Sequence, residues 1–584
     1  MATAPLPALD TGYYLRNFDT LVAFVKSSYA DILPVETLTL IDTYQSLTTP
    51  AQALYVRLLM RKGELFRCDK LAYDEIPDQP QAIDELCQHQ LLERVSSANT
   101  DLSERLMLLT KPELVTLGKV CGTPIASSAR KPDWVDHLVA SAEHDAADHV
   151  DRQKSLDVLL EESYPMIRQA GLAMVDQIKL CFFGNRYQDL SEFVISELGV
   201  VTYENYALDN DHRFYHSTQQ LLNHDRYYQL LASADDIREM DAEALVHLCE
   251  SMPEKTDAVL QRRVERTITR AARQLERLGE LHSARDWFAK TRQPPARERI
   301  VRISAALKEW PAAKAMLNDI QARPIDDDEA EFAQRFIPKV QKALGEPIQK
   351  YTAPEIITNT LTCDFVEGER VEQRVQTVLT DEDTGSVCLY VENLLFNALF
   401  GLYFWDDIFA PVPQAFINPF HRGPLDLFSP DFYIRRTQSI DQRLAYLLEC
   451  PSVDKSGNKS GDKEENLSSE KTILLSQLLA TAQQKAGIAN HFVVWEYATP
   501  ELLTLAVETI PSEDLHAIFQ RMLADLRNNR SGFPDLIRFD PQGYELIEVK
   551  GPGDRLQKNQ IRWLNYFSDH GIPARVLHVE WGSV

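Results

Sequence analysis

Closely spaced cysteines are absent from this 584-residue chain. Its eight cysteines are scattered singly with no Cys-x-x-Cys pair, which indicates neither a disulfide framework nor a zinc finger. Long apolar runs are lacking too: "NLLFNALFGLYF" is interrupted by Asn397 and Gly401 and is too short to cross a bilayer. The start, "MATAPLPALD", has no secretory signal. We therefore expect a cytoplasmic protein with reduced thiols and no membrane contact.

Basic residues are outnumbered by acidic ones, so the formal net charge is -26. Such a field repels phosphate and argues against non-specific wrapping of nucleic acid. Local clusters of basic residues are therefore informative. Five arginines recur at spacings of four, four, three and four, which places them along one helix face: Arg262, Arg266, Arg270, Arg273 and Arg277. Like charges at these spacings repel each other, so the arginine stripe predicts a DNA-binding surface, with a solvated helix face as the alternative.

The first 350 residues show helical periodicity almost throughout. Residues 12–76 are predicted to be helical, and Thr110 with Glu113 forms a capping box that opens a helix–loop–helix similar to a SAP module, a small DNA-binding unit. Further on, "LGELHSARDWF" at 278–288 is echoed by "LKEWPAAKAML" at 307–317, which is typical of a degenerate tetratricopeptide-like repeat. Generic helical-hairpin packing is the alternative.

Two strand-like segments near the C-terminus, "DLIRF" and "YELIEVK", flank a turn from Asp540 to Gly543. A two-residue loop pairs residue 540 with residue 543 and places Asp535 opposite Glu548. Two opposed carboxylates repel each other, and a divalent cation between them would remove that repulsion. A bulge at Gly543 would shift the register by one residue and separate them.

Strand alternation directs Glu548 and Lys550 to one face and Val549 to the other, where it can enter the core. Carboxylate oxygens of this kind suit Mg²⁺ or Mn²⁺. Lys550 could orient or help to deprotonate a water molecule, or stabilise the charge that builds on a phosphate. The alternative is a surface Glu–Lys pair on a half-exposed strand.

The segment "VENLLFNALFGLYFWDDIF" is predicted to be a buried helix, because it is apolar almost all round. Glu392 shares a row of this helix with Phe396, Leu399 and Tyr403. An ionised carboxylate there requires a compensating metal or base, so Glu392 is predicted to be a third metal ligand. A helix N-terminal acid is the alternative.

Pro534-Asp535, Glu548-Val549-Lys550 and "GPGDRLQKNQIRWL" together resemble the VRR-NUC branch of the PD-(D/E)xK nucleases. The order of the upstream segments resembles the Fanconi-associated nuclease family, in a bacterial-type member. The resemblance implies a structure-selective enzyme that cleaves near 5′ flaps, digests 5′ to 3′ and serves interstrand crosslink repair. It implies that the three carboxylates and the Val549 carbonyl bind metal and that Lys550 is catalytic.

The "DRL…Q" stretch of the family matches Arg555 and Gln560. The resemblance implies that Arg555 contacts phosphate and that Gln560 supports the site, whereas helix capping and solvation are the alternatives. Eukaryotic members carry a ubiquitin-binding zinc finger, whose cysteines are lacking here. Recruitment through ubiquitin is therefore not expected. The resemblance implies branched or 5′-flap DNA and DNA-repair proteins as partners, and a nucleoid-associated location in the cytoplasm.

The expected fold is multidomain and mostly α-helical, ending in an α/β nuclease domain with a mixed central sheet. Its predicted parts are a helical DNA-binding domain, a SAP-like module, a helical repeat domain and a VRR-NUC domain: 1–90, 91–150, 151–375 and 376–584. A low-complexity stretch at 450–471 predicts a mobile loop in the last part. Two other functions fit the same residues. One is a junction-resolving or restriction-like nuclease with the same core, and the other is a non-catalytic helical scaffold.

Overall fold

The computed structural model describes residues 12–126, 128–143, 149–188, 201–234, 236–348, 355–381, 383–449 and 464–582. The chain divides into two compact units, Met1–Leu198 and Gly199–Val584. Within the described residues, none of the helices combines the length and the apolar character that a membrane span requires.

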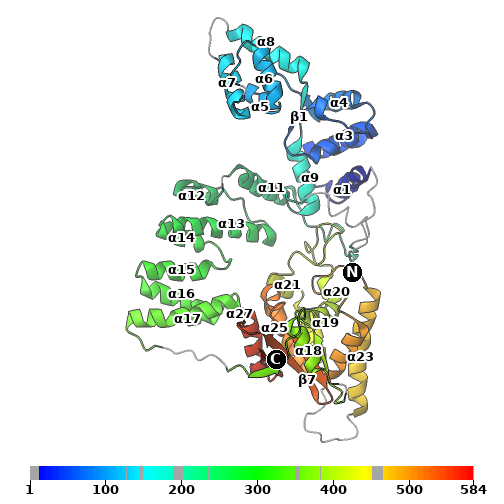
Figure 1. Ribbon diagram of the computed structural model, residues 1–584, viewed down its shortest axis with the longest axis vertical. Helices are drawn as coiled ribbons and strands as arrows, with labels where there is room; N and C mark the ends of the chain where they lie inside the picture. The colour runs from blue at the N-terminus through cyan, green and yellow to red at the C-terminus, as the bar shows by residue number, and fades with distance from the viewer. Residues whose placement is uncertain are drawn as a thin grey trace. The chain divides into compact units, whose positions relative to one another are not determined.

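The first unit combines helices with a small antiparallel sheet (Figure 1). Strand β3 (Met166–Gln169) lies between β1 (Leu65–Arg67) and β2 (Leu92–Arg94). The α-helices around this sheet are α1 (Tyr13–Tyr29), α2 (Val35–Ser46), α3 (Thr49–Leu59), α4 (Gln79–Gln88) and α9 (Leu172–Phe183). The prediction of helix throughout 12–76 is thus wrong at β1 and at the loop that follows it. Because β3 comes far later in the chain, the predicted boundary at residue 90 separates strands of one sheet.

The helix–loop–helix predicted beyond residue 100 is confirmed, and it is inserted between β2 and β3. The predicted pair is α6 (Lys111–Val120) and α7 (Lys131–Glu143). Helices α5 (Leu102–Met107) and α8 (His149–Ser163) precede and follow it. The backbone N–H of Thr110 donates to Glu113 at 2.7 Å, as the capping box requires. Trp134 is fully buried against α6, where a Cβ on Gly118 would lie 2.5 Å from its ring. A glycine is therefore needed for this close approach, and the DNA-binding role of the module stays a prediction.

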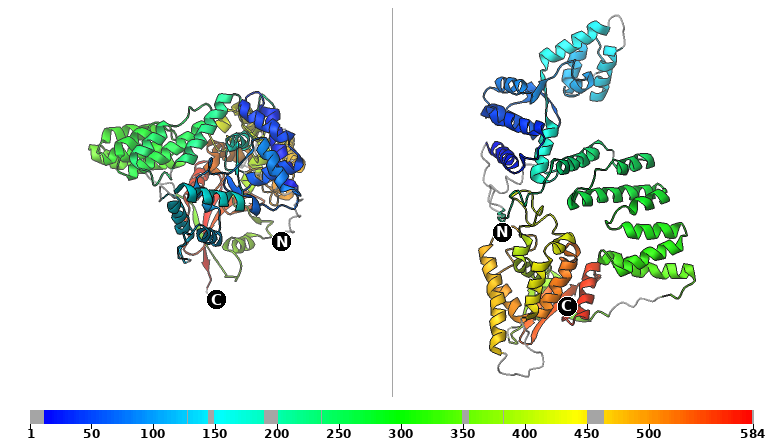
Figure 2. Two further views of the ribbon diagram at one scale, coloured as in Figure 1. Left: turned by 90° about the horizontal axis from the view of Figure 1, so that it is seen from above. Right: turned by 180° about the vertical axis from the view of Figure 1, so that it is seen from behind.

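The second unit begins with a series of helices, and from α12 to α17 each packs on the next (Figures 1 and 2). These are α11 (Thr218–Ser233), α12 (Ala242–Glu250), α13 (Ala258–Arg277), α14 (Leu281–Phe288), α15 (Ala296–Ala306), α16 (Trp310–Ala322) and α17 (Asp327–Leu344). The two echoing segments occupy equivalent turns, between α13 and α14 and between α15 and α16. Gly279 (φ 89°) and Lys308 (φ 62°) are both left-handed there, so the sequence echo reflects a repeated structural hairpin.

The part of this unit that the sequence predicts to be a nuclease domain, called the nuclease part below, is built on a mixed five-stranded sheet in the order β4-β8-β7-β6-β5. Its strands are β4 (Thr358–Cys363), β5 (Val387–Tyr390), β6 (Leu536–Asp540), β7 (Gly543–Lys550) and β8 (Ala574–Trp581). Helix α18 (Val371–Leu379) packs on β5, β6 and β7, and α27 (Lys558–Asp569) packs on β8. The predicted α/β class with a mixed sheet is confirmed, but the predicted start at residue 376 leaves β4 outside the domain to which it belongs.

The β6–β7 hairpin has the predicted register. Asp540 pairs with Gly543 and Leu536 with Ile547, so one further step places Asp535 level with Glu548. The Asp540 side chain accepts the backbone N–H of Gln542 at 2.9 Å, which stabilises the two-residue loop. No bulge therefore separates the two carboxylates.

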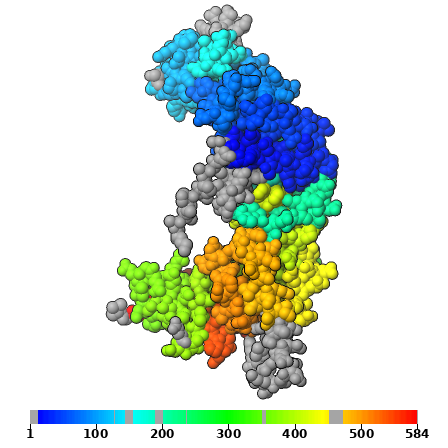
Figure 3. Space-filling view, turned by 90° about the vertical axis from the view of Figure 1, so that its right-hand side faces the viewer, coloured from blue at the N-terminus to red at the C-terminus, as the bar shows by residue number. Residues whose placement is uncertain are grey.

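Helices pack on the sheet face that carries Glu548 and form one core with it. Figure 3 shows their yellow and orange segments packed together at the surface of the molecule. They are α19 (Leu395–Tyr403), α20 (Trp405–Ile408), α21 (Asp431–Ile434), α22 (Thr437–Glu449), α23 (Glu464–Gln484), α24 (Pro500–Thr509), α25 (Ser512–Ala524) and α26 (Leu526–Asn529). Residues 450–463 of the predicted loop lie outside the described residues. From Glu464 onward the backbone is helical, so the loop ends earlier than predicted.

A segment upstream of the repeats completes this core. Tyr206 stacks on Phe416 at 3.8 Å between ring centroids, and its hydroxyl donates to the carbonyl of Asn418. Trp405 Nε1 donates to Glu204 at 2.7 Å. Residues from the start of the unit therefore belong to the nuclease core, although the helical repeats separate them from it in the sequence.

The repeats also touch the nuclease part directly, where α17 lies beside α27 (Figure 1). Arg562 on α27 pairs with Asp328 at 2.7 Å and with Glu331. Arg521 on α25 pairs with Asp327 at 2.8 Å. The acidic first turns of α17 thus hold two arginines of the nuclease part.

Candidate active site

Glu548 is the most deeply buried member of the predicted site, with 0% of its surface exposed. Lys550 Nζ lies 2.6 Å from Glu548 Oε1, so the two form a buried ion pair. Glu548 Oε2 accepts no hydrogen bond from any residue that the structure describes. Burial raises the pKa of Glu548 to about 7, nearby Asp535 acts in the same direction, and Lys550 opposes both. The Lys550 ammonium therefore offsets part of the cost of burying this charge, but two buried carboxylates share that one ammonium.

Asp535 precedes β6 and is also buried. Its Oδ2 accepts the backbone N–H of Val549 at 2.8 Å, which continues the hairpin pairing by a side chain. Burial raises the pKa of Asp535 to about 6, and Glu392 and Glu372 add to the effect, whereas the Val549 N–H and Lys550 oppose it. Asp535, Glu548 and Lys550 therefore share one environment, as the register predicted.

Glu392 is not where the helical pattern placed it. Helix α19 begins only at Leu395, and Glu392 lies exposed in the turn before it. The reason is long-range: the N–H groups of Val391 and Glu392 donate to the carbonyl of Asp535, and Asn393 is left-handed at φ 51°. The buried helix is confirmed, but the argument that burial of Glu392 demands a metal is wrong. Its place beside Asp535 comes from backbone pairing instead.

The carboxylates gather without forming a finished metal site. Glu392 accepts hydrogen bonds from the Tyr390 hydroxyl and, at 3.3 Å, from Asn393 Nδ2. Among the residues that the structure describes, no three acidic, His or Cys side chains are close enough to ligate one ion. What the site has is an excess of negative charge: three predicted ligands and Glu372 face the single ammonium of Lys550.

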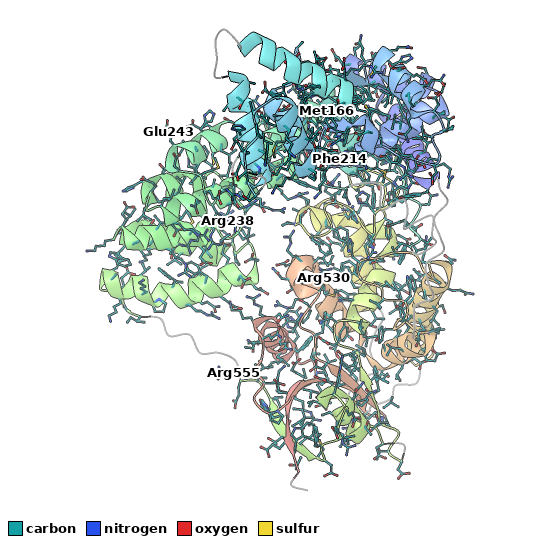
Figure 4. The ribbon with its side chains drawn as sticks, turned by 45° about the horizontal axis from the view of Figure 1, so that its top comes forward. Met166, Phe214, Arg238, Glu243, Arg530 and Arg555 are labelled. Carbon is teal, nitrogen blue, oxygen red and sulfur yellow. The ribbon has the colours of Figure 1, made fainter. Side chains whose placement is uncertain are left out.

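Arg555 and Gln560 differ in what surrounds them. Arg555 is exposed, makes no hydrogen bond or ion pair with a described residue, and extends outward from the loop before α27 (Figure 4). Gln560 accepts the backbone N–H of Gln557 at 2.8 Å and caps α27. Helix capping, the alternative for Gln560, thus accounts for its side chain, while Arg555 stays available to a ligand.

The arginine stripe lies on α13 as predicted. Arg262 pairs with Asp431 at 2.6 Å. The other four, Arg266, Arg270, Arg273 and Arg277, are exposed and make no ion pair or hydrogen bond with the described residues. Unpaired like charges on one helix face favour an anionic partner over a structural role.

Sequence reasoning missed a second basic group, which surrounds Phe428. Arg530 lies over the ring at 4.7 Å, and Arg527 donates to the Phe428 carbonyl at 3.3 Å (Figure 4 labels Arg530). Burial lowers the pKa of His491 to about 4, with Arg530 and Arg422 acting in the same direction. The three arginines form no ion pair with a described acid. Arg527 and Arg530 are three residues apart, but Arg422 and Phe428 come from a distant segment, so no local pattern could have identified the whole group.

Tyr390 and Glu372 were missed as well. Tyr390 is the last residue of β5 and Glu392 lies in the turn beyond it, so strand alternation does not predict their contact. Glu372 lies on α18, whose packing on β7 only the fold reveals.

Comparison with known proteins finds relatives along the whole chain. The VRR-NUC domain model matches residues 470–581, and the model of the FAN1 HTH domain matches residues 12–93. The chain is 32% identical over 610 residues to a Fanconi-associated nuclease 1 homolog of Pseudomonas aeruginosa, covering 99% of this chain and 98% of that protein. It is 23% identical to the Arabidopsis thaliana homolog, covering 99% and 68%. A crystal structure of paFAN1 bound to DNA with a two-nucleotide 5′ flap and a gap matches with a TM-score of 0.76, 31% identity and coverage of 99% and 100%. The chain therefore belongs to the Fanconi-associated nuclease 1 family and is a DNA nuclease.

Proposed function

We propose that this nuclease uses a divalent metal to cleave branched DNA near 5′ flaps and to digest it 5′ to 3′, in the service of interstrand crosslink repair. The related structure holds a 5′-flap DNA, and similarity along the whole chain supports the same substrate class here. The observation that carries the proposal is the fully buried carboxylate of Glu548, which lies beside the Asp535 carboxylate and pairs with the Lys550 ammonium at 2.6 Å.

The donor set fits Mg²⁺ or Mn²⁺, because it offers hard carboxylate oxygens, among them Glu548 Oε2, which accepts no hydrogen bond from a described residue. Glu392, Asp535 and Glu548 would hold the ion, with the Val549 carbonyl as a further donor. A bound divalent ion lowers the pKa of water and stabilises negative charge on oxygen. Lys550, at the end of the same strand, would orient the attacking water or stabilise charge on the phosphate.

DNA would be held through its phosphates, so selectivity should follow shape more than base sequence. The exposed arginines of α13 and the basic group around Phe428 offer two such surfaces, and Arg555 offers a further phosphate ligand. Both surfaces belong to the unit that carries the catalytic residues.

Replacing three stripe arginines tests the first surface. We expect R266Q/R270Q/R273Q to weaken flap binding and to reduce the slope of log Kd against log salt by about one for each phosphate that the variant no longer neutralises. Cleavage at saturating DNA should be unchanged. The control R302Q/R335Q removes arginines that pair with Glu298 and Glu331. Fluorescence anisotropy at several salt concentrations measures Kd and its salt slope for each variant. Equal slopes for the two variants would show that DNA does not bind at the arginine stripe.

The substrate class is tested by cleavage of 5′-flap, 3′-flap and four-way-junction DNA, each with Mg²⁺ and with Mn²⁺. We expect preferential cleavage of the 5′ flap, dependent on the ion and abolished by a chelator. Preference for the four-way junction would indicate a junction-resolving enzyme with the same core. Binding without cleavage of any substrate would indicate a scaffold.

A further inference from the structure

The turn before α19 and the loop that leads into β6 are joined by hydrogen bonds. The backbone N–H groups of Val391 and Glu392 donate to the carbonyl of Asp535 at 2.9 and 3.2 Å. Glu392 and Asp535 are two of the three carboxylates proposed to hold the metal. The separation of their main chains is therefore set by this junction, and residues that hold the junction act on the site.

Asn393 spans the junction with one side chain. Its Oδ1 accepts the backbone N–H groups of Gly532 and Phe533 at 2.8 and 3.2 Å, and its Nδ2 donates to Glu392 Oε1 at 3.3 Å. Two N–H groups directed at one atom require that atom to be the carbonyl oxygen, which leaves the amide nitrogen for Glu392. The φ of 51° is a left-handed conformation that asparagine tolerates better than most residues.

Asn397 holds the same loop from α19. Its Nδ2 donates to the carbonyl of Asn393 at 2.6 Å and to that of Arg530 at 2.8 Å. On the opposite side the loop meets α27: Gly532 has a φ of 94°, and a Cβ there would lie 2.8 Å from Asn559. The loop before Asp535 is thus confined between α19 and α27, and hydrogen bonds from two asparagine side chains hold its backbone in place.

We propose that Asn393 and Asn397 are positioning residues of the metal site, which fix the main chains of Glu392 and Asp535, two of the proposed ligands, relative to each other. The inference rests on the proposed role of these carboxylates as ligands. Side chains that orient ligands through hydrogen bonds typically change metal affinity or activity by about 10–100-fold when removed. A purely structural role would lower stability and leave metal affinity unchanged.

The test is the dissociation constant for Mn²⁺, obtained from the dependence of Tm on Mn²⁺ concentration for the full chain without DNA. We expect N393G to raise that constant about tenfold or more. Glycine accepts the left-handed φ, so this variant removes the side chain without backbone strain. The control Q90G changes another left-handed residue, with a φ of 59° in the first unit, and should leave the Mn²⁺ response unchanged.

If N393G fails to fold, a second variant, N397L, tests whether the asparagines position the metal site. Position 397 is buried in an apolar helix and its Oδ1 has no partner among the described residues, so leucine suits the site. About tenfold weaker Mn²⁺ binding by either folded variant supports positioning, and wild-type binding by both overturns it. A wild-type chain that shows no Mn²⁺-dependent rise in Tm would instead overturn the proposed metal site itself.

Discussion

Replacement of Lys550 by alanine is expected to lower single-turnover cleavage of 5′-flap DNA by on the order of 10²–10³-fold or more. Lys550 supplies the ammonium paired with Glu548, at the point where charge would develop on the phosphate. Flap DNA should still bind, because the proposed phosphate-binding groups are other side chains. Rapid-quench kinetics with Mn²⁺ measures the rate, and anisotropy with Ca²⁺ measures binding.

The matched control is K342A, which removes an exposed lysine at the end of α17. It should cleave at the wild-type rate. If K550A cleaved within about tenfold of the wild type, Lys550 would have no part in the chemical step. If cleavage and binding disappeared together, its role would be in binding DNA.

Replacement of Glu548 by glutamine is expected to stabilise the metal-free protein and to abolish its response to Mn²⁺. Burial raises the pKa of Glu548 from its ordinary 4.5 to about 7, so the folded state binds this proton more tightly than the unfolded state. The stabilisation that protonation gives is therefore present below pH 4.5 and disappears as the pH rises to about 7. Without metal at pH 8, E548Q should melt about 3 °C or more above the wild type.

With Mn²⁺ the order should reverse, because the ion stabilises the wild type and finds a neutral amide in E548Q. Differential scanning calorimetry with and without the ion measures both effects, and cleavage by E548Q should be abolished. The control E580Q replaces an exposed glutamate of the neighbouring strand β8 and should change neither quantity. An equal Mn²⁺ response in E548Q and wild type would show that the ion binds elsewhere.

The hairpin at the centre of the site was predictable because its determinants are local. A short polar turn fixed the pairing of Asp540 with Gly543, and alternation then placed Asp535 level with Glu548. The repeat was predictable for the same reason, since its left-handed turns recur at a fixed spacing. Within a few residues of a turn, the local sequence is enough to predict the backbone conformation and the strand register.

The errors concern pairings between distant segments. Glu392 read as a helix residue because the apolar pattern continues through it, but pairing with Asp535 holds it outside the helix. Strand β4 was assigned to the helical repeat domain, because its partner β8 lies more than two hundred residues later. Neither pairing has a local signal. The candidate ligands could therefore be named from sequence, but not the hydrogen bonds that hold them together.

The ion pairs of α17 and the stacking of Tyr206 have a practical bearing on how this enzyme can be divided. A fragment cut at the predicted start, residue 376, would lack β4 at the sheet edge and leave Arg521 without its aspartate. It would also uncover Phe416. No single cut releases an intact catalytic module, because the helical repeats form an insertion within it.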